Sequence, residues 1–350
     1  MTHNFNAGPS ILPREVFEEA SRAVLNFNDT GLSILEIGHR TPLFENVLEE
    51  ARQTLRELMN LNADKEILFL HGGASTQFFQ VPMNLLNEDE TAAYLDCGVW
   101  GIKPIKEARN FGNVDVVASS KDRNYTYIPR NYTIPSNAKY FHYTTNNTIE
   151  GTEVFEIPET NIPLIADMSS DILSREMDFN RFSLIYAGAQ KNIGAAGVNV
   201  VIVDKNILKG VNRKLPSMMD YRIHIENGSM LNTPPVFAIY VCMLTLRWVK
   251  KMGGIAAMER INTKKANLLY DTLDAHPEFK PTVNREDRSR MNVVFTMDSP
   301  EKEKAFLDCC KQQKMVGVKG HRSVGGFRVS LYNALPLESV IALTDLIKSF

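Results

Sequence analysis

The sequence is poor in cysteine and carries no excess of charge of either sign. Its 350 residues include four cysteines, of which Cys97 and Cys242 are isolated and Cys309 and Cys310 are adjacent. These spacings match neither a disulfide framework nor a zinc site, and so few cysteines indicate a reducing compartment. A formal net charge of −2 gives no general attraction to nucleic acid or acidic membranes. Any anion-binding site must therefore be local.

Long hydrophobic runs are missing as well. Residues 1–6 are polar and lack the apolar core of a signal peptide. The apolar stretch Val236–Leu246 is too short to span a bilayer. We therefore expect a cytoplasmic protein whose partners include neither a membrane nor nucleic acid.

What the sequence does contain is an alternation of strands and helices. Several of the strand-like runs are apolar at every position, as expected when both faces of a sheet are covered. The full set of strand-like runs, wholly apolar or not, is Ile67–Leu70, Ala92–Leu95, Val114–Ala118, Tyr140–Thr144, Leu164–Ala166, Leu184–Tyr186 and Val198–Val203. Strands that alternate with helices are typical of a largely parallel sheet. We therefore expect an α/β fold whose ligands bind at the carboxyl ends of the strands.

Helical segments flank this alternation and indicate two domains. Helices are predicted up to Asn26, over Glu45–Met59, and from Pro235 to about His276 with a break at Gly253–Gly254. The remainder reads as a smaller unit, with strands over 292–296, 316–318 and 327–331 and helices over 301–313 and 337–350. We predict a large domain of residues 15–254 with a mostly parallel sheet. A smaller α/β C-terminal domain comprises residues 255–350 together with the N-terminal segment 1–14.

One lysine lies among small residues between two of the apolar strands, in the run Tyr186–Gly194. Gly188 and Gly194 let the backbone bend tightly there or pass close to a ligand. Partial desolvation would make the Lys191 amine nucleophilic, as in lysines that form a Schiff base with pyridoxal phosphate. A solvated loop lysine is the alternative reading of these residues alone.

Two other stretches have the form of a phosphate site at a helix start. Ile67–Gln77 reads as a strand, a Gly72–Gly73 turn and a helix start, whose free amides can cradle a phosphate. The stretch Asn232–Pro235 precedes an apolar helix, with Thr233 expected as N-cap and proline at the first helical position. Each could also be plain turn or capping punctuation.

Two side chains at strand ends suit a planar cofactor. Asp167 ends an apolar strand and could keep a ring nitrogen protonated, as pyridoxal phosphate requires to act as an electron sink. Trp100 lies between small residues after another strand and could stack on a ring, or simply pack in the core. Asp167 precedes Lys191 by one crossover unit, so that both would reach the same edge of the sheet.

Basic residues suited to anions occur as an early pair, His39–Arg40, and a late set, His321–Arg322 with Arg328. Arg328 lies in an alternating strand of an otherwise apolar unit. A planar guanidinium there suits a carboxylate held by two hydrogen bonds. Scattered surface arginines are the alternative.

Taken together, these motifs resemble the phosphoserine aminotransferases, which are pyridoxal-phosphate-dependent transferases of fold type I, class V. The resemblance covers essentially the whole chain, and several motifs in the right order are far more specific than any one. They are Asn6–Pro9, Gly38–Arg40, His71–Ser75, Gly98–Trp100, Asn146–Gly151, Ala166–Ser170, Gly188–Asn192, Asn232–Pro235 and the region of His321–Arg322 and Arg328.

The resemblance implies a role for each of these positions. Lys191 would bind pyridoxal 5'-phosphate covalently, Asp167 would pair with its ring nitrogen, and Trp100 would stack on its ring. The further cofactor-binding residues implied are Ala74, Ser75, Thr148 and Gln190, with Asn232 and Thr233 reaching the phosphate from a partner subunit. The substrate-binding residues implied are Ser10, His39, Arg40, His321, Arg322 and Arg328, with Arg328 on the α-carboxylate.

The implied activity is amino transfer from L-glutamate to a phosphorylated 2-keto acid, 3-phosphohydroxypyruvate, in a homodimer with shared active sites. One anion pocket must then accept either a carboxylate or a phosphate. Some family members carry a basic residue where Ser75 stands, which leaves its part in anion binding open. Some bacterial members also serve pyridoxine synthesis, and this sequence does not decide that question.

Two alternatives remain at this stage. Another class V enzyme, such as an alanine–glyoxylate-type aminotransferase or a cysteine desulfurase, would share most of the motifs, although Cys309–Cys310 on a predicted helix is a poor candidate for a mobile desulfurase cysteine. A non-catalytic phosphate-binding α/β protein would explain Lys191 alone. It would leave Asp167, Trp100 and the late arginines without a common explanation.

Overall fold

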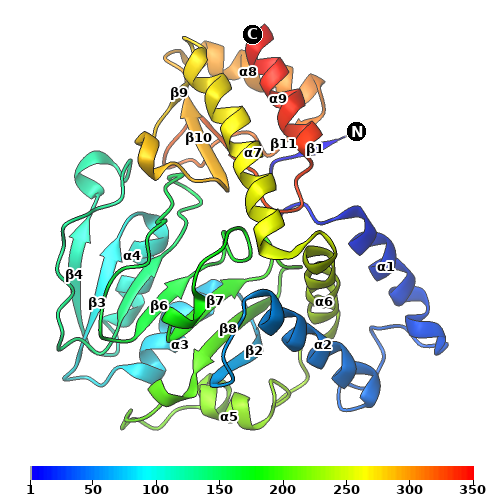
Figure 1. Cartoon of the computed structure of the whole chain (residues 1–350), viewed down its shortest axis with the longest axis vertical. Helices are drawn as coiled ribbons and strands as arrows, with labels where there is room; N and C mark the ends of the chain where they lie inside the picture. The colour runs from blue at the N-terminus through cyan, green and yellow to red at the C-terminus, as the bar shows by residue number, and fades with distance from the viewer. Residues whose placement is uncertain (1) are drawn as a thin grey trace.

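A sheet of seven strands forms the centre of the larger part of the protein (Figure 1). The computed structural model describes residues 2–350. Each of the seven strand-like runs expected from the sequence overlaps one of these strands, so that prediction is confirmed. Their order across the sheet is β2-β8-β7-β6-β5-β3-β4. Their bounds are β2 Lys65–His71, β3 Thr91–Asp96, β4 Asn113–Ser119, β5 Phe141–Thr144, β6 Leu164–Asp167, β7 Leu184–Gly188 and β8 Val198–Asp204.

One strand of this sheet is reversed. β8 runs antiparallel to both of its neighbours, β2 and β7, whereas the remaining neighbours pair in parallel. All strands except β8 therefore point the same way and end at one edge of the sheet. Because β7 and β8 are antiparallel, the loop that joins them stays at that edge and needs no crossover helix. This loop carries Lys191.

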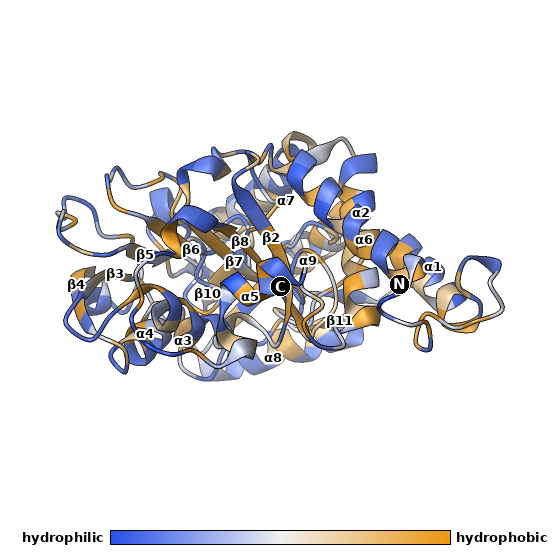
Figure 2. Ribbon diagram, turned by 90° about the horizontal axis from the view of Figure 1, so that it is seen from below, coloured by the Kyte–Doolittle hydropathy of each residue, from blue (hydrophilic) through white to orange (hydrophobic). Residues whose placement is uncertain are grey.

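Helices cover both faces of the sheet, which explains the continuous apolar strands. Ile67 and Phe69 of β2 face one core and Leu68 and Leu70 face the other. Figure 2 shows hydrophobic strands in the interior between more hydrophilic ribbons. On the first face lie α1 (Arg14–Leu25), α2 (Pro42–Leu58) and α6 (Val236–Lys251); on the second lie α3 (Ala74–Leu85), α4 (Val99–Ala108) and α5 (Tyr221–Glu226).

A smaller unit lies above the sheet edge in Figure 1. It contains an antiparallel sheet of order β12-β10-β9 and a two-stranded parallel pair, β1 with β11. The strand β1 (His3–Asn4) was not predicted, because two polar residues carry no periodicity. The other elements are α7 (Gly254–Ala275), β9 (Lys280–Pro281), β10 (Asn292–Thr296), α8 (Pro300–Gln312), β11 (Met315–Val316), β12 (Phe327–Ser330) and α9 (Leu337–Ser349).

The long helix α7 belongs to both parts of the molecule. Its first turns place Ile255 and Met258 in the core beneath the large sheet, while Leu269 and Leu273 belong to the core of the smaller unit. Phe5, in the N-terminal segment, is also buried in the core of the smaller unit. The division at residue 254 stays a prediction.

The start of α6 differs from the expected one. The helix begins at Val236, and its N-cap position is Pro235, without a side-chain cap. The prediction of Thr233 as N-cap is therefore wrong. The physical reason is the pair Pro234–Pro235, because a residue before proline is driven out of the helical region and the helix starts only after the second ring.

Short 3-10 turns connect several elements. They are η1 Phe27–Asp29, η2 Lys121–Arg123, η3 Phe179–Arg181, η4 Lys205–Ile207, η5 Ser217–Met219 and η6 Arg285–Asp287. Over residues 2–350, none of the helices combines the length and the apolar character needed to cross a membrane.

Candidate active site

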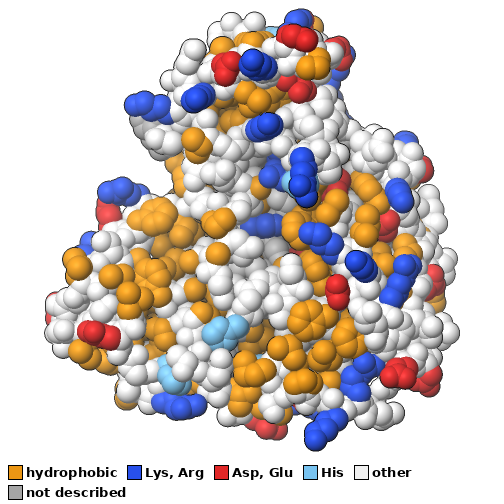
Figure 3. Space-filling view, turned by 180° about the vertical axis from the view of Figure 1, so that it is seen from behind, with side chains coloured by type: hydrophobic (Ala, Val, Ile, Leu, Met, Phe, Trp, Pro, Cys, Tyr) orange, Lys and Arg blue, Asp and Glu red, His pale blue; other side chains and the backbone are white. Residues whose placement is uncertain are grey.

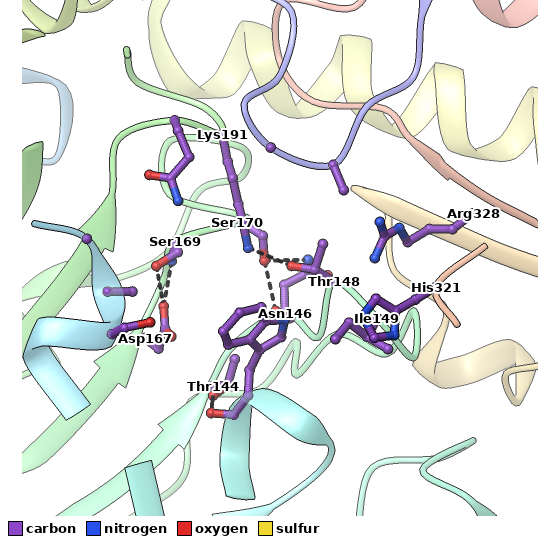
Figure 4. A pocket seen from close by; sticks show the side chains of 17 residues that line it. Thr144, Asn146, Thr148, Ile149, Asp167, Ser169, Ser170, Lys191, His321 and Arg328 are labelled. Atoms are coloured by element: carbon purple, nitrogen blue, oxygen red, sulfur yellow. Dashed lines mark hydrogen bonds between the residues drawn. The ribbon is translucent and has the colours of Figure 1, made fainter. Parts of the chain in front are cut away.

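A cavity of about 300 Å³ lies where the carboxyl edge of the large sheet meets the smaller unit. Figure 3 shows Lys and Arg side chains around the hollow between the two parts, and Figure 4 shows the cavity itself. The cavity brings together residues from the ends of β5, β6 and β7, from the starts of α3 and α4, and from the smaller unit. The predicted site residues that line it are Ala74, Ser75, Trp100, Thr148, Asp167, Gln190, Lys191, His321 and Arg328.

Lys191 is a buried amine in the β7–β8 loop. Ala189 and Ile193 on either side are buried in the core and anchor the loop. Its Nζ donates to Thr148 Oγ1 at 2.7 Å (Figure 4). Burial lowers the pKa of Lys191 to about 8, an effect that Asp167 opposes and Arg328 reinforces. A sizeable fraction of this amine is therefore neutral, and nucleophilic, near physiological pH.

Asp167 is a buried carboxylate at the end of β6. Its Oδ1 accepts hydrogen bonds from the Ser169 amide at 2.9 Å and the Ser169 hydroxyl at 2.6 Å. The same hydroxyl accepts from the Gly188 amide at 3.1 Å. Burial raises the pKa of Asp167, while Ser169 and the Lys191 charge lower it. An oriented, buried carboxylate of this kind suits a protonated ring nitrogen.

Trp100 presents a flat apolar face to the cavity from the first turn of α4. Its ring centroid lies 5.5 Å from Lys191 Nζ and 4.1 Å from Lys103 Nζ. Phe78 packs beside it at 6.3 Å between centroids. The indole Nε1 is buried and finds no hydrogen-bond partner within the described chain. The ring is thus held mainly by packing.

The start of α3 supplies backbone donors to the cavity. Gly73 is the N-cap, so the amides of Ala74 and Ser75 have no carbonyl four residues back within the helix. These amides and the helix dipole together favour an anion. The preceding Gly72 has a φ of +91° and packs so closely on Thr76 Oγ1 that a Cβ would collide with it. The tight turn therefore depends on glycine.

Arg328 offers the cavity a guanidinium without a carboxylate partner. Its Nε is buried and has no hydrogen bond among residues 2–350. Burial lowers its pKa, which Tyr332 and Glu150 raise. Beside it, burial and the charges of Arg328, Arg322 and Lys103 lower the pKa of His321. Positive charge without close acidic partners favours an incoming anion.

The N-terminal segment covers the lysine loop. The Ser10 amide donates to Gln190 O at 2.9 Å, and the Ser10 hydroxyl donates to Lys191 O. Gly8 lies over both residues, since a Cβ there would come within 3.6 Å of Lys191 Cγ. Ser10, which was expected to bind substrate, contacts the loop backbone instead of lining the cavity. Its role in substrate binding stays a prediction.

Five other predicted residues do not line the cavity of the single chain. Arg40, Arg322 and Thr233 are exposed, and His39 and Asn232 are half-buried. His71 at the end of β2 contacts Thr233 O at 2.9 Å and Asn232 Nδ2 at 3.2 Å. Nothing in one chain tests the roles expected of these residues, which therefore stay predictions.

Several polar residues of the cavity were not predicted as site residues. Asn146 donates to Ser170 Oγ and to Asn292 Oδ1, both at 2.8 Å, and so ties the sheet edge to β10. Asn192 donates to Ser170 O at 3.0 Å and accepts from the Asn333 amide at 3.0 Å. The spacing of Asp167 and Ser169 could have revealed their contact, because aspartate often bonds two residues on. The long-range asparagine contacts leave no sequence signal.

The comparisons with known proteins agree with this geometry. A family model described as "Aminotransferase class-V" matches residues 2–343, and the chain belongs to that family. A phosphoserine aminotransferase of Flavobacterium johnsoniae is 56% identical over 348 residues, which cover 99% of this chain and 98% of the relative. The chain is thus placed among the phosphoserine aminotransferases within class V.

Solved structures show the same relationship. Phosphoserine aminotransferase from Bacillus circulans subsp. alkalophilus superposes with a TM-score of 0.97 at 44% identity, covering 100% of this chain and 98% of that one. The phosphoserine aminotransferase of Trichomonas vaginalis, solved with bound pyridoxal phosphate, has a TM-score of 0.95 at 38% identity, covering 99% and 100%. The expected fold type I architecture and the class of pyridoxal-phosphate-dependent aminotransferase are confirmed.

The residues of the cavity fit that cofactor. The buried Lys191 amine has a single hydrogen-bond partner, and the first amides of α3 lack partners within their helix. An aldehyde-bearing ring with a phosphate would meet both needs. Pyridoxal phosphate is accordingly the cofactor of this enzyme class and of this chain.

Proposed function

We propose that the chain catalyses the reversible transfer of the amino group of L-glutamate to 3-phosphohydroxypyruvate, which gives O-phospho-L-serine and 2-oxoglutarate. One observation carries this proposal: a neutralisable lysine, a buried carboxylate and an unpaired arginine converge on one cavity. The relative from Flavobacterium johnsoniae, whose alignment covers 99% of this chain, bears the name of this activity. Serine biosynthesis is the corresponding process.

We assign the cofactor contacts as follows. Lys191 is the point of covalent attachment, Asp167 holds the ring nitrogen protonated, and Trp100 covers one face of the ring. The contacts to the phosphate and the ring substituents come from Ala74, Ser75, Thr148 and Gln190. Pyridoxal phosphate supplies an electron sink that stabilises a carbanion at the substrate Cα.

Lys191 also serves as the acid and base of the reaction. A side chain moves protons most effectively when its pKa lies near the working pH, and burial brings the pKa of Lys191 to about 8. Thr148 Oγ1, at 2.7 Å, orients the amine. Trp100 and the N-terminal residue Gly8 limit the access of water to the same space. The Lys191 amine would accept the proton that leaves the substrate Cα and would then act as the acid that returns a proton, with the bound cofactor supplying the electron sink.

Substrate recognition uses the positive end of the cavity. Arg328 takes the α-carboxylate, which glutamate and the phosphorylated acid share. The distal anion, a carboxylate in one substrate and a phosphate in the other, is received by His321, which lines the cavity, together with His39, Arg40 and Arg322, which lie outside the cavity of one chain. Guanidinium groups suit either anion because they carry positive charge and donate several hydrogen bonds, and an imidazole N–H can donate to the same anion.

We further propose a homodimer in which each subunit completes the site of the other. Asn232 and Thr233 lie beside the exposed His71, near the start of α3, and would reach the cofactor phosphate of a second copy. The four cysteines are free thiols, in keeping with a cytoplasmic location. A second use in pyridoxine synthesis stays open for the same site.

The visible absorption spectrum of the purified enzyme tests the proposal. L-Glutamate should bleach the yellow band of the lysine-bound cofactor, and 3-phosphohydroxypyruvate should restore it. Lys191→Ala should lose turnover by about 10³-fold or more, because one amine acts as both nucleophile and base. The exposed Lys106→Ala is the matched control and should turn over normally.

The possible outcomes test the enzyme class, the amino acceptor and the role of Lys191 separately. If glutamate bleaches the band and only another keto acid restores it, the aminotransferase class stands and the proposed acceptor is wrong. If Lys191→Ala retains normal turnover, the assigned mechanism is wrong.

A further inference from the structure

A buried carboxylate joins two walls of the cavity without lining it. Glu150 follows Thr148, the partner of Lys191, and is 6% exposed. Its Oε1 accepts a hydrogen bond from the Val99 amide at 2.9 Å, at the first residue of α4. Trp100 is the next residue. One side chain therefore links the loop that holds the lysine amine to the helix start that presents the stacking ring.

The contact is tight because residue 98 is glycine. A Cβ on Gly98 would come within 2.6 Å of Glu150 Oε2, and its φ of +149° also disfavours other residues. The carboxylate is thus seated against the backbone at the start of α4. An oxygen anion at this place is favoured by the helix dipole.

The second oxygen of this carboxylate is left over. Glu150 Oε2 is buried and has no hydrogen-bond partner within the described chain. The cation within reach of its field is Arg328, whose Nε also lacks a partner. The other ionisable groups that face Glu150 are Asp96 and Cys97 at the end of β3 and Tyr125 after η2. Burial raises the pKa of Glu150, whereas the Val99 amide and the charge of Arg328 lower it. A buried carboxylate without a close cationic partner is costly and calls for an explanation.

We propose that Glu150 is a positioning residue that sets the anion affinity of Arg328. Its negative charge weakens the hold of Arg328 on a substrate carboxylate without pairing with it. The inference rests on the proposed role of Arg328. In a cycle that releases one acid before it binds the next, equal strengthening of substrate and product binding would slow release without lowering the barrier. By keeping the affinity of Arg328 moderate, Glu150 would let the site bind each substrate and still release each product.

The test is Glu150→Gln in the cofactor-loaded enzyme. Glutamine retains an oxygen for the Val99 amide and loses the charge. The probe is glutarate, a dicarboxylate without the reacting amine. Its binding is measured by the shift that it causes in the absorption band of the cofactor. The dissociation constant should fall by about three- to tenfold, the size expected for one charge at moderate distance in a partly screened site. The KM for glutamate should fall with it, and kcat should not rise.

If Glu150 only supported the start of α4, its replacement would disturb the cavity and raise the dissociation constant of glutarate. Glutarate affinity that is unchanged or weaker in Glu150→Gln would overturn the inference. The matched control is Glu156→Gln, an exposed glutamate on the same loop, which should leave affinity unchanged. Should Glu150→Gln fold poorly, Glu150→Met removes the charge at similar volume and gives the same readout.

A double variant ties the effect to Arg328. In the background Arg328→Ala, the further change Glu150→Gln should no longer tighten glutarate binding. If it still does, Arg328 is not the group that Glu150 acts on, and the inference is wrong. Failure of the proposed function is seen separately, as a wild-type enzyme that binds glutarate and does not turn over glutamate with 3-phosphohydroxypyruvate.

Discussion

The chemistry of the site depends on one desolvated amine. Lys191 is half-buried in a loop between two core strands, and Thr148 is the only hydrogen-bond partner of its amine in the described chain. The ordinary pKa of a lysine leaves almost no neutral amine at pH 7, whereas a pKa of about 8 leaves roughly a tenth. Burial thus does the work that a separate general base does in other enzymes.

This shift predicts how cofactor uptake varies with pH. Only the neutral amine attacks the aldehyde, and burial favours the neutral form, so the attachment rate of pyridoxal phosphate to the apo-protein should rise about tenfold per pH unit up to about 8. Above that it should level off. Stopped-flow growth of the yellow band measures the rate, with Lys191→Ala as the blank. A rate that climbs to about pH 10.5 would show an unperturbed lysine.

At the scale of single elements, the β2–α3 turn sets where the first amides of α3 meet the cavity. Gly72 combines a positive φ with close packing on Thr76, whereas a Cβ on Gly73 would meet nothing within 4 Å. The two adjacent glycines therefore differ in what they tolerate. One is required by the backbone, and the other is only an N-cap.

This contrast predicts different outcomes for two neighbouring substitutions. Gly72→Ala should lower the free energy of unfolding of the apo-protein by about 1–3 kcal/mol, the usual cost of a strained backbone position. It should also weaken pyridoxal phosphate binding. Gly73→Ala, as the matched control, should unfold within about 0.5 kcal/mol of the wild type. Urea denaturation of both variants measures the difference; equal losses would contradict the assignment of strain to Gly72.

The elements themselves were largely predictable, because the strands are short apolar runs bounded by turns. The reversed direction of β8 was not predicted, because the mostly apolar run Val198–Val203 looks alike in either direction. The informative signal was the short loop before it, residues 189–197, which leaves no room for a crossover helix. The false N-cap at Thr233 arose because a favourable capping residue stood before two prolines, whose steric effect prevails.

The same distinction holds for the site. Asp167 and Lys191 could be brought together from sequence, because both follow strands that end at one edge of a parallel sheet. The contacts of Asn146 with Asn292, and the orphan oxygen of Glu150, depend on segments that meet only in three dimensions.

At the scale of the whole molecule, α7 begins in the core of the large sheet and, further along, holds the segment after β12 through a buried lysine. Lys265 Nζ donates to the carbonyls of Leu331 and Tyr332, both at 2.7 Å, and to that of Leu335 at 3.2 Å. These residues follow β12, the strand of Arg328. Tyr332 in turn donates to Ala7 O at 2.8 Å. The position of the arginine relative to the large sheet is therefore set partly through α7.

Lys265→Met is predicted to loosen this connection. The change keeps the length of the side chain and leaves three buried carbonyls without their donor, which should cost about 2–4 kcal/mol in the free energy of unfolding. KM for glutamate should rise, because Arg328 is held less firmly. Lys264→Met, one residue earlier and exposed, is the control. Calorimetry and steady-state kinetics test the pair; identical melting of the two variants would refute the connection.

The pairing of β1 with β11 has a consequence for folding during translation. His3 lies opposite Met315, so β1 can pair only after residues 315–316 have emerged from the ribosome. At roughly 5–20 residues per second, that wait is roughly a quarter of a minute to a minute. Until then the N-terminal segment that lies over the Lys191 loop has no anchor in the smaller unit.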